Sequence, residues 1–153
     1  MPIETRLTQL GIVLPTPPKP VAAYIPARQC GSLLFVSGQL PFKDGELLAK
    51  GPVRSVDDVA RATAAARQCT VNALAVAKGT LGSLNRIAGV VRVGVWVACT
   101  NDFTDQPKVA NGASELLVEV FGEPGRHARA AVGTNALPLG AMVEVEVCFE
   151  VGG

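Results

Sequence analysis

An alanine-rich segment, residues 55–78, most constrains what this chain can fold into. Ser55 and Asp58 have the spacing of a helix N-terminal capping box, and apolar residues recur through the segment at helical spacing. We expect one long helix that ends at Gly79, because glycine is common just past a helix C-terminus. Since most residues on the apolar stripe are small, the helix can pack closely against a sheet formed by the β-rich parts of the chain.

The other segments predict that sheet and a second helix. Residues 22–28 and 33–37 have strand composition and flank a Cys-Gly-Ser turn, so they predict a hairpin. Four more elements are expected further along: 87–99 as the central strand, 105–121 as a helix stopped by Gly122, and 128–135 and 141–151 as the last two strands. This β-β-α-β-α-β-β order predicts an α+β fold, a two-layer sandwich with two helices on one face of a mixed sheet.

The face of the sheet without helices predicts self-association. Val143, Val145 and Val147 alternate along the last strand and need a cover that no further helix provides. Only 18% of the residues are charged, against about 25% in an ordinary soluble domain. We therefore expect a closed ring of subunits.

The first twenty residues differ in composition from the rest of the 153-residue chain. Five prolines, at positions 2, 15, 17, 18 and 20, surround a short amphipathic piece, Glu4–Leu10. Prolines this dense oppose both helix and central strand, so we expect the segment after Gly11 to run extended over the surface. We therefore expect residues 1–20 to form a proline-rich N-terminal arm and residues 21–153 to form a single domain.

Charge and cysteine content argue against several functions. The net charge is +1 and no basic run occurs, so no nucleic-acid partner is expected. The N-terminus lacks the features of a signal peptide and no stretch is apolar enough to span a bilayer, which predicts a cytoplasmic protein without a membrane partner. Four scattered cysteines and a single histidine, His127, predict reduced thiols and no metal site.

Charged residues alternate with apolar ones near the C-terminus. Arg129 lies in the expected strand 128–135, and Glu144 and Glu146 share one face of the next strand, because successive side chains alternate. A strand, a tight turn and a second strand can place the arginine and a carboxylate side by side in the sheet, where they could hold and hydrolyse a small carboxylate. The alternative is an exterior strand whose glutamates are only solvated.

Four short motifs occur along the chain in an order that is typical of one protein family. They are Leu33–Pro41, Asn101–Phe103, Ala128-Arg129 with Leu137-Pro138 eight positions on, and Val143–Glu146. Together they resemble the reactive intermediate deaminase family, also called YjgF-like or endoribonuclease L-PSP. The resemblance runs from Tyr24 to Glu150 and so covers nearly the whole expected domain.

The resemblance implies a chorismate-mutase-like α+β fold and a homotrimer with clefts between subunits. It further implies a hydrolase that converts reactive enamines and imines, such as 2-aminoacrylate, to 2-oxo acids and ammonia without a metal or organic cofactor. Arg129 matches the arginine that pairs with the substrate carboxylate, a task that suits the two-pronged guanidinium. Glu144 matches the carboxylate that activates the attacking water. The structural alternative for Arg129 is an ion pair with a glutamate across the sheet.

Five further positions match residues that line the family's substrate pocket: Tyr24, Ser37, Gly38, Asn111 and Ala131. Three of them have a structural alternative. Tyr24 could be a core or interface residue, Ser37 could bond to backbone groups at a strand end, and Asn111 could lie on the solvated face of a helix. Ala131 stands where family deaminases carry a cysteine. This departure is typical of a divergent branch with its own substrate range.

Two other functions stay open beside the hydrolytic deaminase. The first is a non-catalytic trimer that binds a small carboxylate in the same clefts. The second is an endoribonuclease or translation inhibitor, for which a near-neutral chain with one histidine offers neither a basic track nor the usual acid-base pair.

Overall fold

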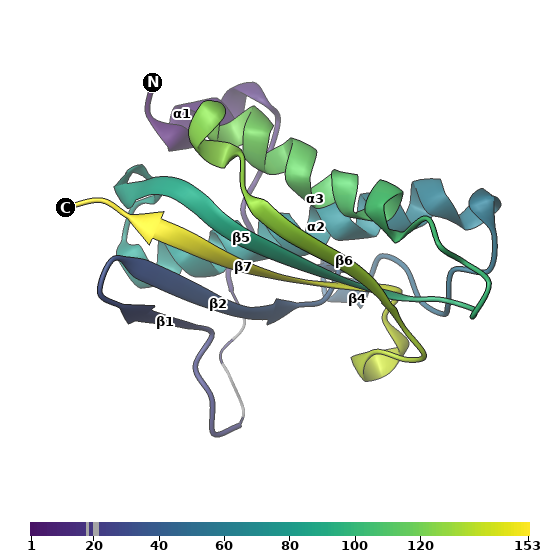
Figure 1. Cartoon of the computed structure of the whole chain (residues 1–153). Helices are drawn as coiled ribbons and strands as arrows, with labels where there is room; N and C mark the ends of the chain where they lie inside the picture. Colours follow the sequence, from purple (N-terminus) through teal and green to yellow (C-terminus); the bar gives the residue numbers. More distant parts are fainter. Residues whose placement is uncertain (18, 20–21) are drawn as a thin grey trace.

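The protein is a two-layer α+β sandwich in which two helices cover one face of a mixed sheet of five strands (Figure 1). This computed structural model describes residues 1–17, 19 and 22–153. The sheet has the order β1-β2-β7-β5-β6, with only β5 and β6 parallel. Its strands are β1 Ala27–Cys30, β2 Leu33–Gln39, β5 Ile87–Ala98, β6 Ala128–Thr134 and β7 Val143–Val151. The helices are α1 Ile3–Gln9, α2 Val59–Leu81 and α3 Gln106–Phe121, and a separate hairpin joins β3 Phe42–Lys43 to β4 Glu46–Leu47.

The predicted order of the main elements and the mixed sheet are confirmed, but three predictions about the strands are wrong. The first strand is Ala27–Cys30, not 22–28. Strand β5, which we expected to be the central strand, lies beside the centre of the sheet, and the central strand is β7. The last two strands, β6 and β7, do not pair, because β5 lies between them and bonds to both. The tight turn between β6 and β7 therefore carries the chain across a neighbouring strand instead of closing a hairpin.

The long helix forms where the alanine-rich segment predicts it, with shifted ends. A 3-10 turn, Val56–Asp58, precedes α2, and Ser55 Oγ accepts a hydrogen bond from the Asp57 amide at 3.3 Å. The prediction that Gly79 ends the helix is wrong, because Gly79 keeps helical geometry. Three residues later Gly82 takes a φ of +83°, the left-handed conformation that terminates helices.

The alternating valines of β7 are covered within the chain, which corrects their expected role in self-association. Val143, Val145 and Val147 are buried, and their strand packs against α2. The opposite face of the sheet, called here the open face, has no helix over it (Figure 1). It carries Phe35 and Trp96, which are 51% and 41% exposed. These aromatic side chains, not the valines, are what a partner would cover.

The N-terminal segment includes a helix that packs on the domain. Leu7 of α1 is buried, and Arg6 Nε donates to the Glu119 carbonyl of α3 at 2.8 Å. Glu4 Oε1 accepts hydrogen bonds from Ser83 Oγ and the Leu84 amide, both at 3.0 Å. Residues 12–17 contain neither helix nor strand, as their prolines predict. Two prolines of the expected arm, at positions 18 and 20, and the first residue of the expected domain, 21, lie outside the described residues.

Candidate functional site

Four of the seven predicted site residues lie on or beside the open face of the sheet. Glu144 shares that face with Trp96, its partner across the β5–β7 ladder, and lies directly against Gly38 of β2. Ser37 Oγ donates to the Ile25 carbonyl at 2.8 Å and the Ser37 amide to the Pro26 carbonyl at 2.9 Å. These two bonds tie the segment that contains Tyr24 to β2, and the tyrosine itself is 58% exposed.

Gly38 is necessary for the position of Glu144. A β-carbon at residue 38 would collide with Oε1 of Glu144, so the missing side chain leaves the space that the carboxylate occupies. A bulge in β2 between Val36 and Gln39 brings Gly38 to this place. Gly94 of β5 provides the same kind of space for the next glutamate, since a β-carbon there would come within 2.7 Å of Glu146 Oε1.

The two glutamates have different surroundings. Glu146 forms an ion pair with Arg92 at 3.6 Å across the open face. Among the residues that the structure describes, Glu144 has no such cationic partner. Burial, with a further contribution from the negative charge of Glu146, raises the pKa of Glu144 above its ordinary value. A half-buried carboxylate with a raised pKa is suited to accept and return a proton.

The remaining three predicted site residues lie at the other side of the sheet. Arg129 of β6 is opposite Val93 and Ala131 is opposite Val95, so both share the face that α3 covers. Arg129 Nη1 donates to Asn111 Oδ1 at 2.9 Å and to Ser114 Oγ at 3.2 Å, both on α3. The expected alternative, an ion pair with a glutamate across the sheet, does not form in the described part of the chain.

The guanidinium of Arg129 is held on one side and available on the other. Both hydrogens of Nη1 are used by the two bonds to α3. Nε and Nη2, the pair of nitrogens that can grip both oxygens of a carboxylate, have no acceptor within the described residues. Because Arg129 is exposed, an incoming anion can reach this edge.

Within one chain, the side chains of Arg129 and Glu144 do not meet. Arg129 and Glu144 point to opposite faces of the sheet, and β5 separates their strands. The expectation that Arg129 and a carboxylate lie side by side in the sheet is therefore wrong. Each chain carries an arginine group (Arg129, Asn111 and Ala131) and a glutamate group (Glu144, Gly38, Ser37 and Tyr24), so one complete site would need two chains.

Two polar residues beside Arg129 were not among the predicted site residues. Ser114 Oγ lies 2.8 Å from His127 Nε2, and His127 Nδ1 lies 2.6 Å from the Gly125 carbonyl. The sequence contains a signal for both, because Ser114 follows Asn111 by three residues on one helix and His127 lies two residues before Arg129, just ahead of β6. Together with Val118 and Arg126, these side chains line a shallow depression of about 260 Å³.

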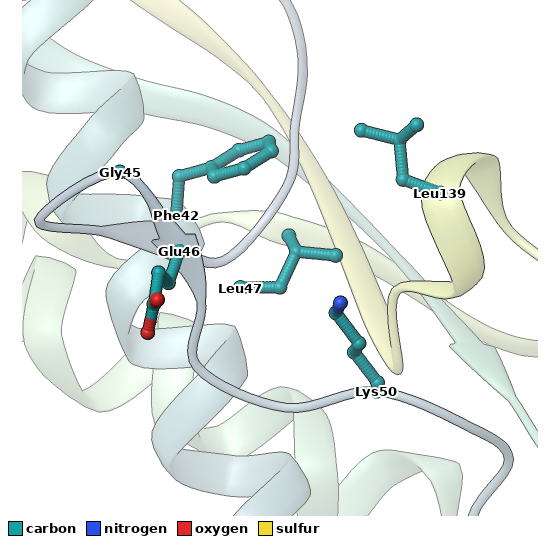
Figure 2. A pocket seen from close by; sticks show the side chains of 6 residues that line it. All are labelled: Phe42, Gly45, Glu46, Leu47, Lys50 and Leu139. Carbon is teal, nitrogen blue, oxygen red and sulfur yellow. The ribbon is translucent and has the colours of Figure 1, made fainter.

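A larger hollow than this depression lies elsewhere. Phe42, Leu47 and Leu139 face a common space of about 480 Å³ from the β3–β4 hairpin and the loop before β7, and Lys50 reaches toward it (Figure 2). None of the predicted site residues lines this hollow. In the described part of the chain, no three His, Cys, Asp or Glu side chains are placed to hold a metal ion, and no helix is long and apolar enough to cross a membrane.

The fold and the two groups define a class of protein, a chorismate-mutase-like α+β domain with a polar site built on its sheet. The family model described as YjgF/chorismate mutase-like, putative endoribonuclease, matches residues 4–151. Protein TCP17 of Trypanosoma cruzi is 41% identical over 97% of this chain and 94% of that protein. The chain belongs to the YjgF/RidA-like family.

Two further relatives carry different functional names. The 2-iminobutanoate/2-iminopropanoate deaminase of Dermatophagoides farinae is 30% identical over 88% of this chain and 91% of that protein. A Shewanella oneidensis protein described as a "putative endoribonuclease" superposes with a TM-score of 0.93 at 35% identity, covering 99% of this chain and 100% of that one. The family is therefore established, while the names of its members divide between imine hydrolysis and RNA cleavage.

Proposed function

We propose that the protein hydrolyses small 2-imino acids to 2-oxo acids and ammonia, in a site that two chains build together. The observation that carries the proposal is the separation of the arginine group from the glutamate group. Within one chain, Arg129 and Glu144 lie on opposite faces of the sheet and cannot act on the same substrate. A second copy that brings its open face against the β6 edge would complete the site. A homotrimer, which the family resemblance implies, has three such junctions, and a cytoplasmic location suits reactive intermediates of this kind.

The arrangement supplies the chemistry that imine hydrolysis needs. Nε and Nη2 of Arg129 would bind the substrate carboxylate and so fix the imine carbon in place. Glu144 of the neighbouring copy would take a proton from a water molecule as its oxygen adds to the imine carbon. Glu144 passes this proton to the nitrogen, which becomes an amino group as the C–OH bond forms. It then takes the hydroxyl proton and passes that to the nitrogen while the C–N bond breaks, so ammonia leaves and the carbonyl group of the 2-oxo acid forms. No net oxidation occurs, and the water supplies the new oxygen.

The deaminase name of a relative and the raised pKa of Glu144 both favour this reaction over the two alternatives. A non-catalytic carboxylate-binding trimer would need Arg129 but would not need a half-buried, unpaired glutamate. An endoribonuclease would need a cationic track for phosphates. The described ion pairs instead engage Arg61, Arg67, Arg92, Lys108 and Arg126 with carboxylates.

The test is a supply of imines from an amino-acid oxidase, with release of the 2-oxo acid followed in time. We expect wild type to accelerate release over buffer and Arg129→Ala and Glu144→Gln to lose at least about a hundredfold in kcat/KM. Arg61→Ala and Glu150→Gln are matched controls, since Arg61 lies outside both groups and Glu150 lies on the same strand as Glu144. Wild-type protein that gives no acceleration with any imine, yet binds pyruvate, would establish the binding protein instead.

A further inference from the structure

A continuous chain of hydrogen bonds leads from Arg129 to the backbone of the loop before β6. A carbonyl oxygen can only accept, so His127 Nδ1 carries the hydrogen that it donates to the Gly125 carbonyl at 2.6 Å. In the neutral imidazole, Nε2 is then an acceptor. The Ser114 hydroxyl, 2.8 Å away, donates to it. This leaves the lone pairs of Ser114 Oγ to accept from Arg129 Nη1 at 3.2 Å.

With a neutral imidazole, every bond of this chain has one permitted direction. The Gly125 carbonyl selects the tautomer of His127, the tautomer selects the rotation of the Ser114 hydroxyl, and that rotation presents an oxygen lone pair to Arg129. Asn111 Oδ1 takes the other hydrogen of Nη1. The guanidinium plane is thereby fixed by two acceptors on one side, and its Nε–Nη2 edge is left directed outward.

We propose that Ser114 and His127 are positioning residues that orient Arg129 for carboxylate binding. Neither side chain touches the ligand in this proposal. Their effect is on the entropy of binding, because an arginine that is already held in one orientation loses less side-chain freedom when the carboxylate arrives. The proposal rests on the proposed function only in assigning carboxylate binding to Arg129.

The first test uses the fact that His127 is the only histidine of the chain. In the full-length protein above pH 8, two-bond ¹H–¹⁵N correlation spectra report the tautomer of a single imidazole. We expect the Nδ1–H tautomer in wild type and a shift of the Nε2 resonance in Ser114→Ala, because its hydrogen-bond donor is gone. A wild-type spectrum dominated by the Nε2–H tautomer would overturn the proposed direction of the chain.

The second test separates ligand binding from turnover. We expect Ser114→Ala to raise KM for the imine, and Kd for pyruvate measured by NMR titration, by about tenfold, with kcat within about twofold. Ser114→Thr, which restores the hydroxyl, should return both constants toward wild type. Glu115→Gln is the matched control, since Glu115 is the exposed next residue of the same helix. His127→Gln gives a second variant, and we expect it to weaken pyruvate binding as well.

The outcomes distinguish this inference from the proposed function. If wild type hydrolyses imines while Ser114→Ala and His127→Gln bind pyruvate as tightly as wild type, the positioning role is refuted and the deaminase stands. If wild type hydrolyses no imine, yet both variants weaken pyruvate binding and Ser114→Thr restores it, the positioning role stands and the deaminase is refuted. A fall in kcat with unchanged KM and Kd would also refute the positioning role.

Discussion

At the scale of single residues, two glycines determine where two carboxylates lie. Gly38 and Gly94 flank β7 on its two sides, and each leaves the space that a glutamate of β7 fills. Glu144 lies against Gly38, while Glu146 lies against Gly94 and pairs with Arg92. A glycine on the neighbouring strand therefore makes room for each glutamate of β7. Glu146 is paired with Arg92, whereas Glu144 has no cationic partner among the described residues.

Gly38→Ala should slow imine hydrolysis without unfolding the protein. The added β-carbon would collide with the Glu144 carboxylate and displace it, so we expect a loss of at least about tenfold in kcat/KM. Gly94→Ala is the control, because it displaces Glu146 by the same means. Activity equal to wild type in Gly38→Ala, measured in the oxidase-coupled assay, would show that the position of Glu144 is unimportant.

The pKa of Glu144 also has a consequence for stability. Its ordinary value is 4.5, and burial raises it in the folded protein. A carboxyl group whose pKa is higher in the folded state favours folding most at pH below 4.5, and this contribution is lost as pH rises through the folded value. We expect Glu144→Gln to unfold at higher urea than wild type at pH 7, and the gap to close at pH 3.5. The difference will be small, since solvent screens a half-exposed group.

At the scale of elements, close contact between α2 and α3 sets the thickness of the helical layer. A β-carbon at Gly112 of α3 would collide with the Thr63 carbonyl of α2. The missing side chain of Gly112 therefore allows this approach. Since Asn111 and Ser114 flank Gly112 on α3, the same contact places the two acceptors that hold Arg129.

Gly112→Ala should destabilise the fold by about 1–3 kcal/mol, because backbone atoms of a packed helix cannot move aside as a flexible side chain can. Gly79→Ala is the matched control on α2. Its β-carbon would meet only the Pro17 side chain at 3.4 Å, and alanine is the better helix former, so we expect a gain of about 0.5–1 kcal/mol. Urea unfolding curves of both variants test the pair, and equal shifts would contradict the close-contact explanation.

At the scale of the whole molecule, the open face and the two separated groups favour assembly. Phe35 and Trp96 are exposed on a sheet face that lacks helices, a surface that soluble monomers rarely present. Glu144 lies on the same face, whereas Arg129 lies at the β6 edge. Docking that covers the aromatic residues would also bring the glutamate group of one copy toward the arginine group of another.

Mixing two inactive variants tests whether the site is shared between chains. Arg129→Ala and Glu144→Gln should each be inactive alone, while subunit exchange at equal ratio should restore about a quarter of wild-type activity, because one junction in four combines two intact groups. Light scattering should give a mass three times that of the 15.8 kDa chain. A mixture that stays inactive after verified subunit exchange, or a monomeric wild type, would contradict the shared site.

The sequence alone determined the two long helices α2 and α3, the order of the main elements and the alternation of β7, because periodicity, caps and turns are local properties. It also determined, through its motifs, the family and the seven candidate site residues. It did not indicate helix α1 or the exact end of α2. Only the tertiary structure decided that β5 separates β6 from β7, that the valines of β7 face α2, and that Arg129 and Glu144 point to opposite faces. Strand pairing joins distant segments and is chosen by the packing of the whole chain, so no local pattern specifies it. The bonds of Ser114 and His127 to their neighbours likewise depend on a helix and a strand that meet only in the folded protein.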